Sequence, residues 1–334
     1  MHSTPRSDCR GTFDSCFPQR YPSQVPINIP KDLPARPVLE SENIFVMDEE
    51  RAVHQDIRPL DIVLLNLMPL KVATETQIAR LLSNSPIQVN FTLLTTDSYA
   101  PKNTPKSHLE AFYTTWKNIR HRRFDGMIIT GAPVEMMPFE EVEYWEELRN
   151  IFTWSRESVF STFCICWAAQ AALYDRFGIE KIELPQKRFG VFPHVRTDVF
   201  APLLRGFDDR FFVPVSRHTT VPPEAFRNHP EIQILSTDEQ DGDVYLAMTG
   251  NGRRIYCFNH PEYDTYTLKD EYERDRVAGK STPLPKNYFP GDDPTKLPVK
   301  NWSGHASLLF SNWLNYCVYQ ETPYDLGRLT ESSS

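Results

Sequence analysis

Residues 159–178, VFSTFCICWAAQAALYDRFG, decide the fold class. Val159–Cys166 is a nearly continuous apolar run, which is typical of a strand buried on both faces of a parallel sheet. A helix is predicted over Ala168–Phe177, and Gly178 supplies the residue type that ends many helices. The turn between strand and helix therefore lies at the carboxyl end of a central strand, where open α/β sheets bind their ligands.

The same alternation of strand and helix precedes this unit. We predict strands at Asp61–Leu67, Val89–Thr95 and Phe124–Thr130, and helices at Thr74–Leu82, His108–Ile119 and Glu140–Trp154. Strands that alternate with helices form right-handed βαβ units. The fold class is therefore α/β, with a mostly parallel sheet and helices on both faces.

The second half of the chain changes character. Short strands with Pro- and Gly-rich joints follow Gly190: VFPHV (191–195), FFVPVS (211–216), EIQILST (231–237), DVYLAMT (243–249) and RIYCFN (254–259). Such spacing indicates mixed or antiparallel additions to the same sheet. Beyond them we predict a charged helix at Glu271–Ala278, a long proline-rich loop over 281–300 and a closing helix at Trp302–Tyr319.

The N-terminal part differs from the rest. Residues 1–24 are polar and without periodicity, so we expect a disordered extension that is dispensable or foreign to the native protein. Residues 26–40 carry four prolines and are predicted to form an extended arm on the surface. Residues 25–334 are expected to form one domain.

Composition bounds the functional classes. The 334 residues contain 36 Lys plus Arg and 44 Asp plus Glu, a net charge of −8, and 40 % are hydrophobic. A disordered chain is excluded, and the acidic balance argues against nucleic acid as a partner. No run approaches the ~20 apolar residues that cross a bilayer. We expect a cytoplasmic protein with free thiols, because six cysteines are too few for a disulfide framework at this length.

Cys166 is the first candidate for chemistry. It follows a buried strand and directly precedes a helix, whose unpaired N–H groups favour a thiolate and offer donors to an oxyanion. Two alternatives stay open at this point. Cys166 is an inert buried cysteine, or Cys164, two residues earlier on the same strand, is the reactive one. A Cys-x-Cys metal site lacks a second pair of ligands.

A second strand end carries Asn259-His260-Pro261-Glu262-Tyr263. Residues two apart in an extended segment project to one side, so Glu262 is placed to fix the tautomer of His260. Taken alone, such a pair is commonly ordinary surface. Together with Cys166 it makes a Cys-His-Glu triad. A third strand end, Thr130–Glu135, contains Gly131 and allows close backbone approach to a ligand, but it lacks the spacing of a phosphate loop.

These segments together resemble the homoserine O-acyltransferases of methionine biosynthesis, which are built on a flavodoxin-like, class I glutamine amidotransferase-like fold. The similarity runs from about Pro26 to Leu326. It includes PINIPKDLPA, LNLMP, TETQIARLLSNSP, TGAPVE, CWAAQAAL, RGFDDRF, NHPEYDT, NYFPGDDP and LLFSNWLNYCVYQETPYDL. Members resembling this chain begin with Met where it has Val25, which is what a GTG start codon appears to encode.

The resemblance implies a ping-pong reaction. Cys166 takes the acyl group of an acyl-CoA as a thioester, and the hydroxyl of L-homoserine then attacks it. His260 is the implied base, and Glu262 orients it. The family's substrate contacts fall on Lys187, Ser216 and Arg274, and Lys71 reaches the same sheet edge as a residue of the acyl site. No metal or cofactor is implied, and a homodimer is expected.

Glu135 decides the expected acyl donor. Members that use succinyl-CoA typically have Gly at this position, whereas Glu135 fills the space and opposes a second carboxylate. The resemblance therefore implies acetyl-CoA, with succinyl-CoA as the alternative donor. The plain alternative is an acidic residue favoured by a helix start. A glutamine amidotransferase or cysteine peptidase is a more distant alternative, because those enzymes usually place glycines around the nucleophile. A non-catalytic binding protein is expected to have lost a triad member.

Overall fold

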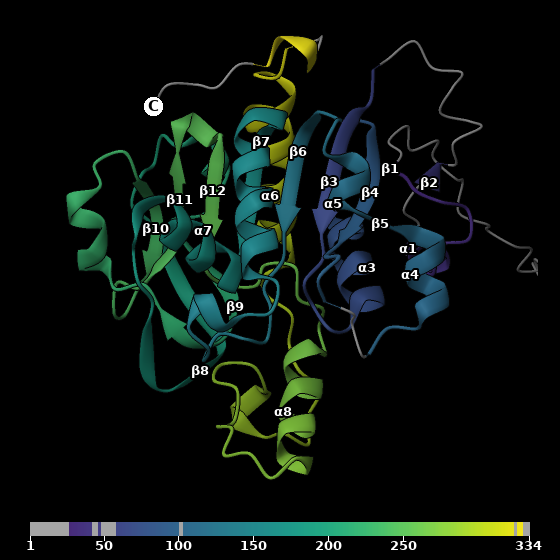
Figure 1. Cartoon of the computed structure of the whole chain (residues 1–334). Coiled ribbons are helices and arrows are strands. Elements are labelled where there is room, and N and C mark those ends of the chain that lie inside the picture. The colour runs from purple at the N-terminus through teal and green to yellow at the C-terminus, as the bar shows by residue number, and fades with distance from the viewer. Residues whose placement is uncertain (1–26, 42–45, 48–57, 100–102, 324–325, 330–334) are drawn as a thin grey trace, which may run out of the picture.

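A mixed sheet runs through the computed structural model, which describes residues 27–41, 46–47, 58–99, 103–323 and 326–329 (Figure 1). Within these residues the sheet has twelve strands, in the order β2-β1-β4-β3-β6-β7-β12-β11-β10-β8-β9, with β5 beside β4. They are β1 (Ile27–Asn28), β2 (Val46–Met47), β3 (Leu60–Leu65), β4 (Val89–Thr95), β5 (Tyr113–Thr115), β6 (Phe124–Ile129), β7 (Val159–Ile165), β8 (Ile182–Arg196), β9 (Arg210–Thr220), β10 (Gln233–Asp238), β11 (Val244–Thr249) and β12 (Arg254–Cys257).

The sheet is parallel in its first part and antiparallel in its second. All pairs from β2 to β12 are parallel, including β6–β7 and β7–β12. The pairs β12–β11, β11–β10, β10–β8 and β8–β9 are antiparallel. This division confirms the predicted mostly parallel sheet with mixed additions in the second half of the chain.

Helices cover both faces of the sheet, as predicted. They are α1 (Ala35–Ser41), α3 (Lys71–Leu82), α4 (Lys106–Phe112), α5 (Trp116–Ile119), α6 (Trp145–Ser158), α7 (Trp167–Phe177), α8 (Thr267–Val277) and α9 (Ser303–Asn312), which continues as a π-helix over Trp313–Tyr319. Strand β3 shows why two layers form. Ile62 and Leu64 pack in one core with α1, α3 and α9. Val63 and Leu65 pack in the other with α5, α6 and α7.

The predicted surface arm is wrong for most of residues 26–40. Ile27–Asn28 is strand β1, and Ala35–Ser41 is helix α1. Ile29, Leu33 and Leu39 are buried in the core. The prolines do not exclude the helix, because Pro37 lies in its first turn, where a backbone N–H has no helical partner. Residues 1–24, predicted to be disordered, lie outside the described residues.

Two predicted helices are also corrected. The helix expected over His108–Ile119 is interrupted by β5, in which Tyr113–Thr115 pairs with Leu93–Thr95 of β4. Contacts remote in sequence hold this strand, since the Tyr113 hydroxyl donates to Glu75 Oε2 (2.8 Å). The helix expected from Glu140 begins at Trp145, after a 3₁₀ turn at Phe139–Glu141.

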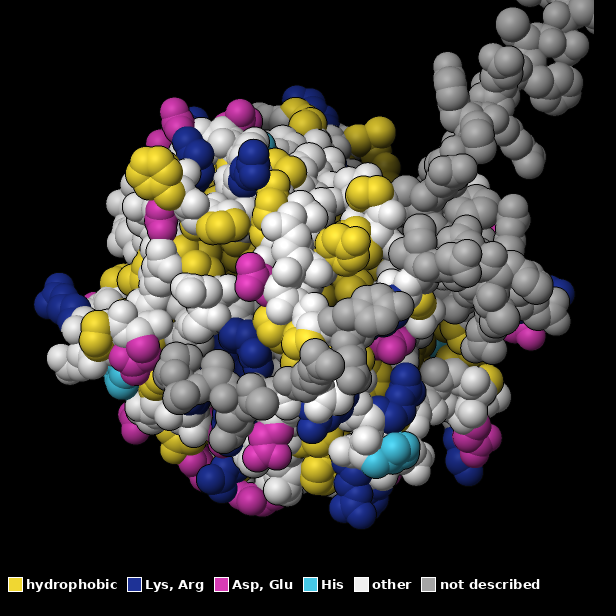
Figure 2. Space-filling view, turned by 90° about the horizontal axis from the view of Figure 1, so that it is seen from above, with side chains coloured by type: hydrophobic (Ala, Val, Ile, Leu, Met, Phe, Trp, Pro, Cys, Tyr) yellow, Lys and Arg dark blue, Asp and Glu magenta, His cyan; other side chains and the backbone are white. Residues whose placement is uncertain are grey.

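The carboxyl ends of the parallel strands meet at one edge of the sheet. Figure 1 shows α8 below this edge, on the side toward which β3 and β6 point. The opposite side, seen in Figure 2, carries Lys and Arg interspersed with Asp and Glu rather than one basic field. Among the helices of the described residues, none has the length and apolar character needed to span a membrane.

Candidate active site

Cys166 occupies a strained turn between β7 and α7. Its backbone φ is +53° and its ψ is −118°, a conformation that residues with a side chain rarely adopt. The strain lets the chain turn sharply from strand to helix with the sulfur at the N-terminal end of α7. Gly131 makes room opposite, because a Cβ there would lie 3.2 Å from Cys166 Cβ. Backbone groups therefore approach the thiol closely.

His260 and Glu262 reach the same point from β12. This strand is the parallel neighbour of β7, so both strands end at the same edge. Nδ1 of His260, in the tautomer that the carboxylate favours, donates to Glu262 Oε1 at 2.7 Å. A Cβ on Gly131 would lie 3.2 Å from Cys166 Cβ and 3.7 Å from His260 Cε1, so the thiol and the imidazole border the same space. The structure thus brings together the three residues of the predicted triad, all of them buried.

The pKa of His260 is raised well above its ordinary 6.5. Burial by itself lowers it, but the charges of Cys166 and Glu262, together with hydrogen bonds to both, outweigh burial. An imidazolium beside the sulfur is therefore favoured in the resting site. The ring therefore lies beside the candidate nucleophile with a proton that it can give to a leaving group.

Cys164 lies away from this chemistry. It is buried inside β7, and burial raises the pKa of its thiol to about 12. In the part of the chain that the structure describes, no group of three or more His, Cys, Asp or Glu side chains is arranged to hold a metal ion.

Lys187, Ser216 and Arg274 come together, but their nearest partners are two acids that the sequence analysis missed. Lys187 Nζ donates to Glu271 Oε1 (2.6 Å), and Ser216 Oγ donates to the same oxygen (2.7 Å). Asp275 accepts from Arg274 Nη2 (3.0 Å) and Lys187 Nζ (3.3 Å). Both acids lie on α8, and no local sequence pattern could have paired them with residues of β8 and β9.

The cations keep Asp275 ionised. Burial raises the pKa of its carboxyl, but the hydrogen bond from Arg274 and the charge of Lys187 lower it to about 2. The subsite beside α8 therefore holds two acids and two basic side chains. Such a set of charges suits a zwitterion, since the acids attract an ammonium and the guanidinium attracts a carboxylate.

Tyr263 joins this subsite to the triad, and the sequence analysis missed it as well. Its ring stacks on His260 at 4.2 Å between centroids and 17° between planes. Burial raises the pKa of Tyr263 well above 10, and the charges of Glu271, Glu262, Cys166 and Glu135 add to this effect. Tyr263 is therefore influenced by charges of the triad, of Glu271 on α8 and of Glu135.

Glu135 lies in the loop after β6, four residues beyond Gly131. Its Oε2 accepts from the His218 amide of β9 at 2.8 Å. Lys181 Nζ donates to the carbonyls of Glu135 and Met137 and so holds the backbone of this loop. The side chain is half-buried. Both its backbone and its carboxylate are therefore fixed in place.

Lys71 lines a cavity of about 340 Å³ beyond the ends of β3 and β6. Burial lowers the pKa of Lys71 from 10.5 to about 8, although nearby Glu75 raises it in part. Other residues that line the cavity are Leu67, Met68, Thr96, Tyr99, Pro133, Val134, Met137 and Tyr144. The lining is mainly apolar, and Asn66, Asn103, Glu141 and Glu143 add polar and charged groups to it.

Behind the triad, His194 supports the residue that precedes His260. Its Nδ1 donates to the Phe192 carbonyl (2.9 Å), and its Nε2 accepts from Asn259 Nδ2 (3.0 Å). Burial lowers the pKa of His194 to about 3, so the ring is neutral. No local pattern predicts this contact, because β8 and β12 are not neighbours in the sheet.

A family model described as homoserine O-succinyltransferase matches residues 26–324. The chain belongs to this family. The matched range includes the candidate site residues of this chain, from Lys71 to Arg274. Relatives similar to this chain carry a different donor in their names. A homoserine O-acetyltransferase of Acetivibrio thermocellus is 58 % identical over 91 % of this chain and 100 % of its own length.

Two further relatives have the same name. Homoserine O-acetyltransferases of Geobacillus kaustophilus and Thermotoga petrophila are 58 % and 56 % identical, each over 90 % of this chain and 99 % of its own length. Among solved structures, a glutamine amidotransferase of Thermotoga maritima matches with a TM-score of 0.48 and 14 % identity, over 77 % of this chain and 97 % of that one.

Proposed function

We propose that this chain is a homoserine O-acetyltransferase that carries the acetyl group of acetyl-CoA to the hydroxyl of L-homoserine through a thioester on Cys166. The observation that carries the proposal is the buried Cys166–His260–Glu262 arrangement at the carboxyl end of β7. The chain that carries this arrangement belongs to the matched family, and the relatives similar to the chain are named homoserine O-acetyltransferase.

In the first half-reaction the Cys166 thiolate attacks the thioester carbonyl of acetyl-CoA. The C–S bond to CoA breaks, and His260 gives its proton to the departing thiol. The amides of Gly131 and Trp167 are the proposed donors to the oxyanion. The amide of Cys166 is engaged instead with the Cys257 carbonyl (2.6 Å).

In the second half-reaction neutral His260 takes the hydroxyl proton of homoserine as its oxygen attacks the acetyl-enzyme. The Cys166 C–S bond breaks, and thiolate and imidazolium are restored together. Glu262 stabilises the imidazolium each time it forms. In this scheme the α8 acids hold the ammonium group of homoserine, and Arg274 holds its carboxylate.

The cavity beside Lys71 is the proposed place for the thioester arm of the acyl donor. Its mainly apolar lining suits a flexible chain without charge, and Lys71 faces it as a buried cation. The first half-reaction transfers the acetyl group from sulfur to sulfur and the second from sulfur to oxygen, so the proposed route needs neither a metal nor a cofactor. We place the enzyme in the cytoplasm, because Cys164, Cys166, Cys257 and Cys317 are free thiols.

Acetyl-CoA is favoured over succinyl-CoA by the charge of Glu135. A succinyl group would bring a second carboxylate toward a half-buried acid that is already anchored on β9. Like charges in such a place are costly. The acetyl group carries no charge and is shorter. Homoserine O-succinyltransferase remains the second candidate, because the family description names that donor.

Intact-mass spectrometry tests the proposal. Incubation with acetyl-CoA alone should add one acetyl group, and homoserine should then remove it with formation of O-acetylhomoserine. Cys166→Ser should gain no acetyl group under these conditions, whereas Cys164→Ser, the matched control, should gain one. Hydrolysis of glutamine without acyl transfer would favour an amidotransferase instead. An unmodified mass would contradict the thioester.

A further inference from the structure

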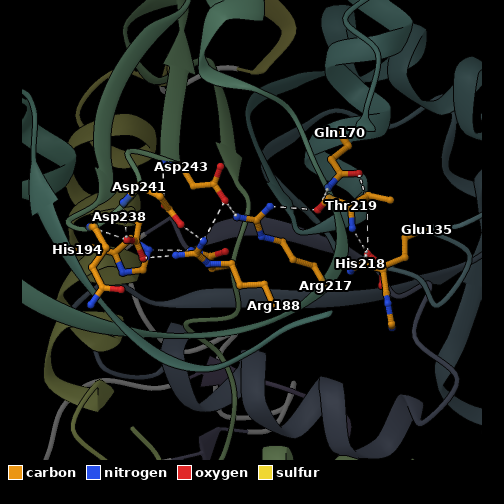
Figure 3. Close-up of polar contacts among 12 residues, drawn as sticks. Glu135, Gln170, Arg188, His194, Arg217, His218, Thr219, Asp238, Asp241 and Asp243 are labelled. Atoms are coloured by element: carbon orange, nitrogen blue, oxygen red, sulfur yellow. Dashed lines mark hydrogen bonds and ion pairs between the residues drawn. The ribbon is translucent and has the colours of Figure 1, made fainter. Parts of the chain in front are cut away.

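The carboxylate of Glu135 is held by a single segment of β9 (Figure 3). Oε2 accepts from the amides of His218 (2.8 Å) and Thr219 (3.3 Å) and lies 3.3 Å from the Thr219 hydroxyl. The two amides belong to the backbone, so any residue would supply them. The hydroxyl is the one contact in this group that depends on the side chain present.

The Thr219 hydroxyl is itself oriented by α7. Its single proton is shared between two acceptors, Gln170 Oε1 at 2.9 Å and Glu135 Oε2 at 3.3 Å, and Gln170 Nε2 donates back to the Thr219 carbonyl at 3.3 Å. Both side chains are almost fully buried, each on a residue with 1 % exposure. Gln170 lies one helical turn after Cys166. The side chains of Gln170 and Thr219 therefore connect helix α7, which follows Cys166, with the carboxylate of Glu135.

A buried ion network holds Thr219 from the other side. Arg217 donates from Nη1 to the Thr219 carbonyl (3.1 Å) and from Nη2 to Asp243 (2.8 Å). Arg188 pairs with Asp243 and Asp238 in turn. Figure 3 shows this line of contacts running from Asp238 to Glu135. Thr219 has little freedom to move, because its carbonyl and its hydroxyl are fixed on opposite sides.

We propose that Thr219 is a specificity-determining residue that keeps the Glu135 carboxylate in the path of a charged acyl group. The inference rests on the proposed acyl transfer and extends it. Glu135 by itself is a flexible side chain that could rotate away from an incoming carboxylate. When Thr219 holds it, the Glu135 side chain does not rotate away. An acyl donor with a terminal carboxylate then meets the negative charge of Glu135. Acyl selectivity then depends on β9 as well as on the loop after β6.

The test is a competition between acetyl-CoA and succinyl-CoA at equal concentrations, with the ratio of O-acetyl- to O-succinylhomoserine as the readout. Thr219→Val keeps the shape and removes the hydroxyl. We expect the ratio to fall about fivefold, as for one ordinary hydrogen bond, because the proton is shared with Gln170 and the two amides still bind the carboxylate. Thr219→Ser restores the hydroxyl and should stay within about twofold of the wild type. Thr219→Ala, a second way of removing the hydroxyl, should shift the ratio in the same direction as Thr219→Val.

The double variant separates positioning from a general loss of structure. If Thr219 acts through Glu135, Thr219→Val should change nothing further in a Glu135→Gly background, and the two effects should be non-additive. The KM for homoserine should stay unchanged. A shift of equal size in both backgrounds, or an unchanged ratio in Thr219→Val and Thr219→Ala, overturns the inference alone. A wild type that forms no O-acetylhomoserine overturns the proposed function first.

Discussion

In the proposed mechanism, Glu262 acts on the reaction through the charge of the His260 imidazolium. Its carboxylate is one of the two charges that raise the pKa of His260 against the effect of burial. The contact is short and buried, so solvent screens it little. Removing the charge without changing the size of the side chain isolates this effect.

Glu262→Gln should lower kcat by about 10²- to 10⁴-fold, in line with other triad carboxylates. The pKa of His260 should fall, so the thiolate–imidazolium pair is weakened and iodoacetamide should alkylate Cys166 more slowly at pH 7. Urea unfolding should be nearly unchanged. Glu231→Gln, on an exposed His–Glu pair with the same spacing, is the matched control. An unchanged kcat in Glu262→Gln would leave that residue without a catalytic role.

Lys71 offers a test of stability against function. Its pKa is about 8 in the folded chain and close to 10.5 when exposed, so folding disfavours its charged form. The penalty is fully present below pH 8, and it diminishes as the pH rises from 8 to 10.5. The free energy of unfolding of Lys71→Met, measured in urea, should therefore exceed that of the wild type by about 2 kcal/mol at pH 7. The difference should be smaller at pH 10.

The same variant should lose acyl transfer, since the proposed site loses its buried cation. A substitution that stabilises the fold but lowers the activity is typical of a residue in a functional site. A Lys71→Met protein that is less stable at pH 7, with the difference growing toward pH 10, would contradict this account.

Among the secondary-structure elements, β8 depends on a close backbone approach. Gly190 bridges to Lys286 in the loop that follows α8, and a Cβ on Gly190 would lie 2.4 Å from both N and O of Lys286. Its φ of +141° adds strain for any other residue. The bridge fixes the strand three residues beyond Lys187, beside the proposed homoserine subsite.

Gly190→Ala should destabilise the fold by about 3 kcal/mol or more in urea unfolding, because backbone atoms rather than a flexible side chain must move. Gly242→Ala is the matched control. It shares a positive φ of +75° but has nothing within 4 Å of the added Cβ, so about 1 kcal/mol is expected. Equal losses in the two variants would rule out the contact with Lys286 as the cause.

The elements that were predicted well are those whose signal is local. The apolar runs at β3, β6 and β7 and the glycine after α7 follow from strand and helix chemistry alone. Strand β5 was missed because its reason is remote: Tyr113 bonds to Glu75 and Asn66, outside its own segment.

The same distinction holds for the site. The triad was predictable because each member follows a strand end, and parallel neighbours end at the same edge. Glu271 was not predictable, because its partners Lys187 and Ser216 lie on β8 and β9, which adjoin each other only through an antiparallel hairpin. Glu271 lies on a helix rich in charged residues, and such residues usually face solvent.

At the scale of the whole molecule, we predict a homodimer. Several large apolar side chains are exposed in the described residues, among them Phe200 at 90 % and Val199 at 57 %. Burying such groups favours association. Multi-angle light scattering should give twice the mass of one chain, and Phe200→Ser, with Val277→Ser at the exposed end of α8 as a control, would locate the contact. A single-chain mass at micromolar concentration would contradict the prediction.

The position of β12 between β7 and β11 also governs the order in which the molecule can be completed. During synthesis β7 and its neighbours emerge first, and the hydrogen-bonding edge of β7 stays open until the ribosome has made β8 to β11 and then β12. An apolar strand with an unpaired hydrogen-bonding edge can pair wrongly with a strand of another chain. Insertion of β12 closes that edge and brings His260 to Cys166 in the same step, so the proposed catalytic pair is complete only when the open edge of β7 has disappeared.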